Sequence, residues 1–152
     1  MPFAIAVFFS SCFRPKPDMP DFKLMLLDST TILNTRDIPT GKPSLLLFFD
    51  PYCDYCQKET IDITKHMDSM KNVNFYFITI DSFRLMWAFN GYFGLYKYPN
   101  ITVGRDFTYS FPAKFPKVTP PYAVLYDKYK RARVVIPGRV DASKIISFIQ
   151  QL

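Results

Sequence analysis

The order of apolar and polar residues predicts short strands that alternate with amphipathic helices. A continuous apolar run at residues 45–49, bounded by turn residues at 41–43, is typical of a strand that is buried on both faces. Apolar residues then recur at helical spacing from about residue 53 to residue 70, and residues 73–81 return to a strand pattern. The order strand, helix, strand predicts a right-handed crossover between two parallel strands.

Two hairpins and a terminal helix complete the predicted fold. Alternating apolar residues on both sides of a turn predict a β-hairpin at residues 19–39. A second antiparallel pair is expected at residues 121–138, where the connecting turn is basic. Asp141 is a candidate N-cap for a C-terminal helix whose apolar residues form one stripe.

The part of the chain between these elements has a weaker pattern. Residues 82–96 have helical periodicity, which glycines interrupt near the end of the segment. We expect Trp87 and its aromatic neighbours to pack in the core, with a substrate groove near the cysteines as the alternative. Residues 98–118 contain several prolines and predict loops, in which one short strand or helical turn could occur.

Composition and charge restrict the class of protein. The chain has 152 residues, of which 49% are hydrophobic and 21% charged, so it has the composition of one globular domain and not of a disordered chain. Its net charge is +6, and the densest basic run, at residues 128–133, falls in the turn of the second hairpin, where a solvated face accounts for it. Because no nucleic-acid-binding module is recognisable, nucleic acid is not an expected partner.

The expected chemistry centres on two of the three cysteines. Cys53 and Cys56 are separated by two residues and lie where the buried strand meets the first long helix. The backbone amides and the dipole at the start of a helix favour a thiolate, so Cys53 is the expected nucleophile and Cys56, one turn further along, the expected resolving thiol. A purely structural disulfide is the alternative, but so short a loop would stabilise the folded chain little.

Other side chains offer little for different chemistry. The chain has one histidine, His66, so a four-ligand zinc site would lack partners. We expect His66 to be a surface or half-buried residue of the first long helix. We expect neither a metal nor an organic cofactor.

These motifs resemble those of the thioredoxin superfamily over nearly all of the chain after its N-terminal segment. The sequence is most similar to the TlpA/ResA-like thiol–disulfide oxidoreductases, especially lipoproteins of Bacteroidetes-like bacteria. The stretches that carry the resemblance are MPDFKLMLLD, GKPSLLLFF, CDYCQKE and TPPYAVLYD. The resemblance implies that residues 20–152 form an α/β domain of thioredoxin-like fold, with a central mixed β-sheet flanked by helices and an N-terminal β-hairpin extension.

The resemblance also implies roles for individual residues. Pro121 matches a cis proline that packs against the disulfide, and Pro120 tolerates the extended conformation required before proline; a trans loop is the alternative. Glu59 matches an acidic residue one helical turn after Cys56 that, if partly buried, would have a raised pKa and exchange the Cys56 proton. A surface carboxylate paired with a lysine is the alternative. Leu47 stands where thioredoxin has a buried aspartate, so a proton relay would depend on Glu59.

Three residues beside the cysteines depart from the family pattern. Tyr52 stands where the family has tryptophan, and Asp54 and Tyr55 replace the common Gly-Pro pair between the cysteines. We expect these residues, together with Pro120, to line the substrate groove. The carboxylate of Asp54 disfavours a neighbouring thiolate, which predicts a reduction potential nearer that of thioredoxin, about −270 mV, than that of DsbA, about −120 mV.

The predicted function is a thiol–disulfide oxidoreductase that reduces periplasmic protein disulfides as a monomer. Its expected partners are protein disulfides or dithiols and an upstream membrane thiol–disulfide reductant, as the resemblance implies. A peroxiredoxin-like thiol peroxidase is an alternative, because peroxiredoxins share the fold. Asp50, three residues before Cys53, argues against it, since a group that only accepts hydrogen bonds would repel the peroxide anion. A binding lipoprotein with a vestigial redox pair is a further alternative.

Residues 1–19 predict a signal-peptide remnant followed by a lipoprotein tether. A short apolar stretch precedes the residues FSSC, which resemble the lipobox of bacterial lipoproteins, so Cys12 is the expected lipidated residue. The domain would then lie on the periplasmic side of a bacterial membrane. No positive residue precedes Cys12, so either the start codon lies upstream or the segment is a buried N-terminal extension with a free cysteine.

Overall fold

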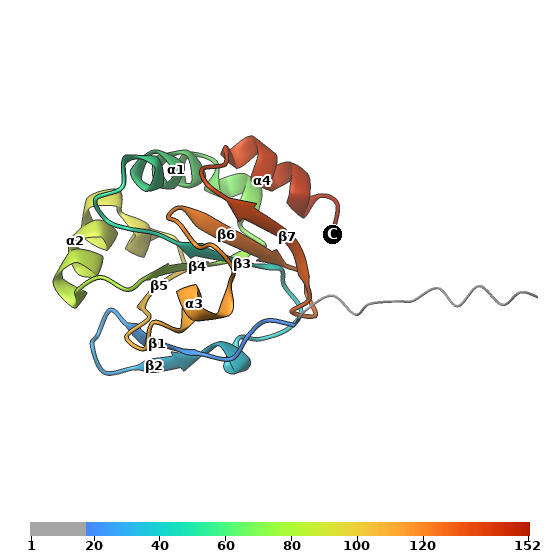
Figure 1. Ribbon diagram of the computed structural model, residues 1–152. Helices are drawn as coiled ribbons and strands as arrows, with labels where there is room; N and C mark the ends of the chain where they lie inside the picture. The colour runs from blue at the N-terminus through green and yellow to red at the C-terminus, as the bar shows by residue number, and fades with distance from the viewer. Residues whose placement is uncertain (1–17) are drawn as a thin grey trace, which may run out of the picture.

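The computed structural model describes residues 18–152, which form a mixed seven-stranded β-sheet with helices on both faces (Figure 1). The strand order is β2-β1-β5-β4-β3-β6-β7. The strands are β1 (Lys23–Leu26), β2 (Ile32–Asn34), β3 (Ser44–Phe48), β4 (Asn74–Thr79), β5 (Ile101–Arg105), β6 (Tyr122–Tyr126) and β7 (Ala132–Pro137). The helices are α1 (Asp54–Lys65), α2 (Phe83–Phe93), α3 (Ser110–Lys114) and α4 (Ala142–Ile149). This confirms the predicted α/β class, whereas the tether expected around Cys12 lies outside the described residues.

Strand β3 forms the middle of the sheet and leads directly to the cysteines. It pairs in parallel with β4 and antiparallel with β6, so that Leu45 lies opposite Phe75 on one side and Leu125 on the other. All five of its residues are buried. The crossover from β3 through α1 to β4 is therefore the predicted parallel unit, and the apolar run reflects burial of the strand on both faces.

The two faces of the sheet have separate cores, because successive residues of a strand point to opposite faces. Leu45 and Leu47 pack in a layer with residues of α1, α2 and α4. Leu46 and Phe48 pack in the other layer, with α3 and with the N-terminal hairpin. Figure 1 shows α1 and α4 above the central strands, and α3 between these strands and the N-terminal hairpin. Among the described residues, no helix is long and apolar enough to cross a membrane.

The expectation of loops with one short strand or helical turn at residues 98–118 was right only in part, because both kinds of element are present. This region contains strand β5, which lies between β1 and β4, and the short helix α3. The entry to β5 is held by Asn100, whose side-chain amide donates to the Val73 carbonyl oxygen at 2.8 Å. Near the other end of β5, a Cβ added to Gly104 would lie 2.9 Å from the Leu24 Cβ, so only glycine allows this close approach. Long-range pairing, and not local propensity, makes this segment a strand.

The expectation that Trp87 packs in the core was wrong. The buried side of α2 is formed by Met86, Phe89 and Asn90, whereas Trp87 is 62% exposed. The face of the helix that meets the sheet is thus rotated away from the tryptophan. The helix continues through Gly91 and ends at Gly94, whose left-handed backbone, with φ of 64°, closes the last turn.

Helix α4 begins where it was predicted but is capped from another helix. Asp141 occupies the N-cap position, yet its side chain makes no capping hydrogen bond. The backbone amide of Ala142 instead donates to Oδ2 of Asp62, a residue of α1, at 2.7 Å. This contact ties the two helices that cover one face of the sheet.

Candidate active site

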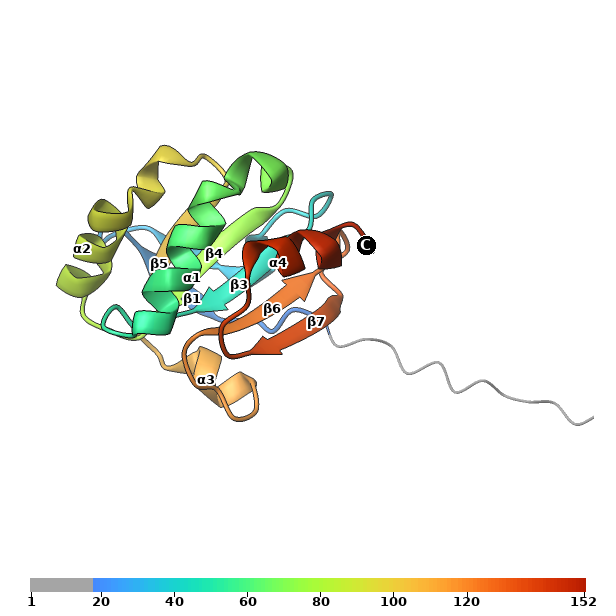
Figure 2. The same ribbon diagram turned by 90° about the horizontal axis from the view of Figure 1, so that it is seen from above.

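The cysteines lie on a short loop that connects the end of β3 to the start of α1. Phe49 anchors this loop, because its buried ring packs against Phe89 of α2 with the ring centroids 4.4 Å apart. The Asp50 carboxylate then accepts a hydrogen bond from the Tyr52 amide at 2.8 Å, and the Asp50 carbonyl oxygen accepts one from the Cys53 amide at 3.1 Å. Figure 2 shows the start of α1 at the same end of the sheet as the start of α2.

Cys53 is the N-cap residue of α1, so the predicted start of the helix is confirmed. Its backbone is extended, and its Sγ accepts a hydrogen bond from the Cys56 amide at 3.4 Å. The thiol also lies 3.8 Å from the carbonyl oxygen of Pro120. The sulfur thus accepts a backbone N–H at the start of the helix, where the helix dipole is positive.

Cys56 lies one turn into the helix and is only 1% exposed. Burial raises the pKa of its thiol well above the usual range, although the backbone of Asp50 has a smaller opposing effect. Cys56 is therefore a protonated and shielded thiol, whereas Cys53 is partly exposed. Of these two cysteines, Cys53 is therefore the one that a molecule outside the domain can reach.

The peptide bond between Pro120 and Pro121 is cis, as predicted. Pro121 is buried, and its carbonyl oxygen accepts a hydrogen bond from the Gly138 amide at 2.9 Å. The two prolines directly precede β6, which pairs with β3 in a register that puts Tyr122 opposite Phe48. This pairing brings the diproline segment to the cysteines although 67 residues separate Pro120 from Cys53.

Glu59 is completely buried, one turn after Cys56 on α1. Within the described part of the chain, neither of its carboxylate oxygens has a hydrogen-bond partner. Burial raises its pKa from 4.5 to about 8, while the nearby Val140 backbone amide and the Arg139 guanidinium partly oppose this rise. The alternative of a surface carboxylate paired with a lysine is thus wrong. The negative charge of ionised Glu59 in turn contributes to the raised pKa of Cys56.

A hollow of about 430 Å³ is lined in part by Pro120, whose carbonyl oxygen lies 3.8 Å from the Cys53 thiol, and it is called the hollow beside Cys53. Tyr55, Pro120 and Pro121 line it, as expected for a groove at this site. Tyr52 and Asp54 are exposed beside the cysteine but are not among its lining residues. Two lining residues that sequence reasoning missed are Lys117, in the loop after α3, and Arg139, just after β7. The sequence carries no local signal for them, because only tertiary packing brings both segments to the hollow that Pro120 and Pro121 line.

Other positions singled out in the sequence lie apart from this chemistry. Leu47 is buried within β3, so no ionisable group replaces thioredoxin's buried aspartate there. His66 lies at the far end of α1, where its Nδ1 is 2.9 Å from the Asp62 carbonyl oxygen. Across residues 18–152, no group of three His, Cys, Asp or Glu side chains is placed to hold a metal ion.

Known proteins share this architecture. Three solved structures of similar fold are a secreted disulfide oxidoreductase of Mycobacterium tuberculosis homologous to E. coli DsbE (20% identity, TM-score 0.71, covering 86% of this chain and 96% of that one), M. tuberculosis DsbF (24%, 0.70, 86% and 93%) and a reduced 2-Cys peroxiredoxin of Plasmodium vivax (19%, 0.71, 90% and 80%). At these identities they show that the fold is thioredoxin-like. No curated protein matches the sequence.

A family model makes the assignment more specific. The AhpC/TSA family model matches residues 15–90, which is half of the chain. The matched region includes β3, the cysteine loop and α1, which together carry Cys53, Cys56 and Glu59. The chain therefore belongs to the AhpC/TSA family of thioredoxin-like thiol–disulfide oxidoreductases and peroxiredoxins.

Proposed function

We propose that this protein reduces disulfide bonds in other proteins through the Cys53 and Cys56 pair. The observation that carries the proposal is the asymmetry of the two thiols: Cys53 is accessible at the start of α1, and Cys56 is buried one turn behind it. Thiol–disulfide exchange requires one sulfur that meets the substrate and a second that acts only after the first has reacted. The geometry suits this sequence of events.

The reaction proceeds in two exchanges. The Cys53 thiolate attacks one sulfur of the substrate disulfide, which forms a mixed disulfide and releases the other substrate sulfur as a thiolate that takes up a proton. Cys56 then loses its proton and attacks Cys53 Sγ, which releases the second substrate thiol and leaves a Cys53–Cys56 disulfide. The substrate gains two electrons and two protons. A dithiol reductant, proposed here to be a membrane thiol–disulfide protein, must return them before the next cycle.

Glu59 is the proposed acceptor of the Cys56 proton. With a pKa of about 8, roughly one molecule in ten carries an ionised Glu59 at pH 7, so a base is available inside the protein. Leu47 leaves no ionisable side chain at the aspartate position of thioredoxin. Because the carboxyl is buried one helical turn from Cys56, it can exchange a proton without opening the site to water.

Trapping of mixed disulfides tests this function. Cys56→Ser should accumulate covalent complexes with natural partners, because the resolving sulfur is missing, and Cys53→Ser is the matched control that should trap none. Wild-type protein should also reduce insulin in the presence of a dithiol reductant. An inactive wild-type protein, or trapping by Cys53→Ser, would contradict the proposal and favour a binding protein with a vestigial pair.

The direction of the reaction is proposed from the charge between the cysteines. Asp54 is exposed in the first turn of α1, where its carboxylate disfavours a thiolate at the adjacent Cys53. This leads us to expect a reducing protein with a potential near about −270 mV. Equilibration with a dithiol buffer measures the value, and a potential above about −180 mV would contradict the proposed direction.

Protein disulfides are preferred to peroxides as the proposed substrate. The family includes peroxiredoxins, but here the position three residues before Cys53 is Asp50, whose carboxylate accepts the Tyr52 amide and can offer no hydrogen to a peroxide. We expect turnover of hydrogen peroxide to be negligible beside reduction of insulin. The opposite order of activities would favour the peroxidase alternative.

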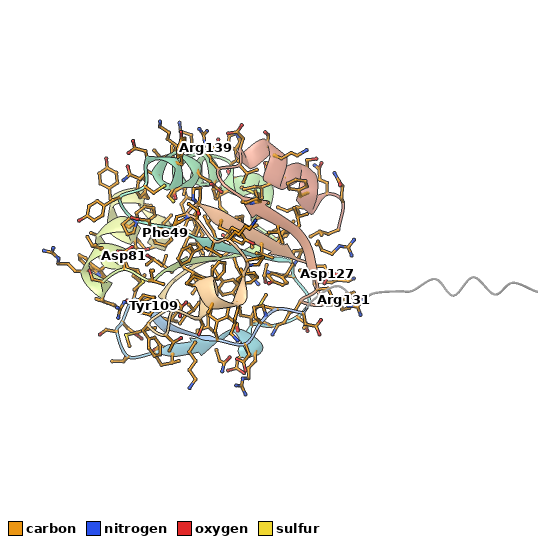
Figure 3. The ribbon with its side chains drawn as sticks, viewed as in Figure 1. Phe49, Asp81, Tyr109, Asp127, Arg131 and Arg139 are labelled. Atoms are coloured by element: carbon orange, nitrogen blue, oxygen red, sulfur yellow. The ribbon has the colours of Figure 1, made fainter. Side chains whose placement is uncertain are left out.

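Anchoring through Cys12 on the periplasmic side of a bacterial membrane is also proposed. Asp18, the first described residue, pairs through its backbone with Arg131, in the turn between β6 and β7, as an isolated antiparallel β-bridge. That turn lies at the end of the sheet away from the cysteine loop, and Figure 3 shows Arg131 at the edge of the domain, well apart from Phe49. A tether that leaves from Asp18 therefore leaves the active site open to partners. Cys12→Ser should move the protein from the membrane fraction to the soluble fraction.

A further inference from the structure

The hollow beside Cys53 carries two positive charges and no negative one. Tyr55, Pro121 and Pro137 give it apolar walls, and Lys117 and Arg139 are its charged members. None of its lining residues, all in the described part of the chain, is acidic. A substrate segment that reaches the cysteine across this hollow therefore meets a surface with a net positive charge.

The backbone of the hollow offers few hydrogen-bond donors to such a segment. Pro120 and Pro121 have no N–H group, and the Gly138 amide is already bonded to the Pro121 carbonyl oxygen at 2.9 Å. The diproline wall therefore presents carbonyl oxygens, which cannot bind the carbonyl groups of an extended substrate. Selectivity at this wall must come from side chains.

Lys117 is held beside the hollow by a constrained loop. Its φ is 53°, in the left-handed region that residues other than glycine rarely adopt. Pro116 and Pro120 stiffen the loop around it. Within residues 18–152, no carboxylate lies within ion-pair distance of its ammonium group. The charge of Lys117 is thus available to a substrate.

Arg139, two residues after the end of β7, is the other charged residue that lines the hollow. Its guanidinium is 2.9 Å from the Asp141 carboxylate, but the side chains are 38% and 67% exposed. An ion pair this exposed contributes little to stability, so the guanidinium can leave Asp141 and bind a carboxylate of a substrate instead. Figure 3 shows Arg139 at the surface beside α1 and α4.

We propose that this hollow selects protein disulfides flanked by acidic residues, with Lys117 and Arg139 binding the flanking carboxylates. The inference rests on the proposed reduction of protein disulfides and names the class of substrate. Charge complementarity with the acidic segment supplies the specificity that the proline-lined backbone cannot. Asp54, exposed in the first turn of α1 and not part of the hollow, would repel the same carboxylates if they bound close to it.

Matched peptide disulfides test the proposal. Three short peptides, identical except for glutamate, glutamine or lysine on both sides of one cysteine, are oxidised to disulfide dimers, and the second-order rate constant for their reduction is measured at low and high salt. Two exposed ion pairs, each raising the rate constant about threefold, should make reduction of the glutamate peptide about tenfold faster than reduction of the glutamine peptide. High salt should lower this ratio of rate constants.

Charge-reversal variants assign the preference to the hollow. Lys117→Glu should lose most of the ratio between the glutamate and glutamine peptides, and the double variant with Arg139→Glu should favour the lysine peptide. Lys117→Glu alone is included because Arg139 also influences Glu59. The control, Lys128→Glu with Arg131→Glu, changes the net charge equally at the far end of the domain and should keep the preference for glutamate.

Three results would overturn the proposal. If wild-type protein reduces the glutamine peptide but shows no preference for glutamate, this inference fails while the proposed function stands. If the control pair removes the preference as fully as the Lys117 variant does, the whole-protein charge is responsible and the hollow is not. If none of the peptides is reduced, the proposed function fails and the inference fails with it.

Discussion

The glutamate buried behind the resolving thiol should make the stability of this protein depend on pH. Glu59 is fully buried without a hydrogen-bond partner in the described chain, and burial raises its pKa from 4.5 to about 8. The folded state therefore holds the proton more tightly than the unfolded state. The contribution of Glu59 to the free energy of unfolding is fully present below about pH 4.5, where the carboxyl is protonated in both states. This contribution is lost as the pH rises towards about 8, because the carboxyl ionises first in the unfolded chain.

Glu59→Gln removes this titration and keeps the shape of the side chain. At about 1.4 kcal/mol per pKa unit, the rise from 4.5 to about 8 corresponds to about 5 kcal/mol above pH 8, of which about 3 kcal/mol develops between pH 5 and pH 7.5. The glutamine amide also lacks hydrogen-bond partners, and this changes the free energy of unfolding of the variant by the same amount at every pH. The pH-dependent part of the difference is therefore due to the carboxyl group.

Urea unfolding of both reduced proteins between pH 5 and pH 7.5 measures this difference. The free energy of unfolding of the wild type should fall by about 3 kcal/mol relative to the variant over this interval. The two cysteines and all other titrating groups are common to both proteins, so their contributions cancel. A difference that stays constant within about 0.5 kcal/mol would refute the raised pKa and, with it, the case for Glu59 as an internal proton acceptor.

Three further outcomes follow from the contacts of the fold. Asp62→Ala should lower the free energy of unfolding by about 1 kcal/mol because it removes the cap of α4, whereas Asp141→Ala should change it less, which chemical unfolding would show. Gly104→Ala should lower stability by about 1 to 3 kcal/mol because its Cβ would collide with β1. Gly91→Ala, in an exposed turn of α2 with open space around it, should raise the melting temperature through a gain of roughly 1 kcal/mol, and a loss there would contradict the packing described.

The core of the active site could be predicted because it is built from local patterns. A buried apolar strand, a turn and an amphipathic helix follow each other directly in the sequence, so the position of Cys53 at the start of α1 required no knowledge of distant contacts. Cys56 and Glu59 follow on the same helix, at spacings of one turn. Pro121 required the family resemblance, because its place beside Cys53 depends on the pairing of β6 with β3.

Other features were decided by tertiary structure. Strand β5 has a weak local pattern and exists because β1 and β4 supply its hydrogen bonds on both sides. The exposure of Trp87 depends on which face of α2 meets the sheet, and helical spacing alone left that open.

The sequence by itself determined the chemistry, and the tertiary structure determined its surroundings. The order of strand, cysteines and helix is short-range and specifies an accessible cysteine at the start of α1 with a buried one a turn behind it. The depth of Glu59 and the joining of Lys117 and Arg139 at one hollow depend on segments far apart in the chain. Burial and charge at a point in space are sums over all the segments that fold around it, so only the complete fold sets the pKa of the buried acid and the charge that a substrate meets.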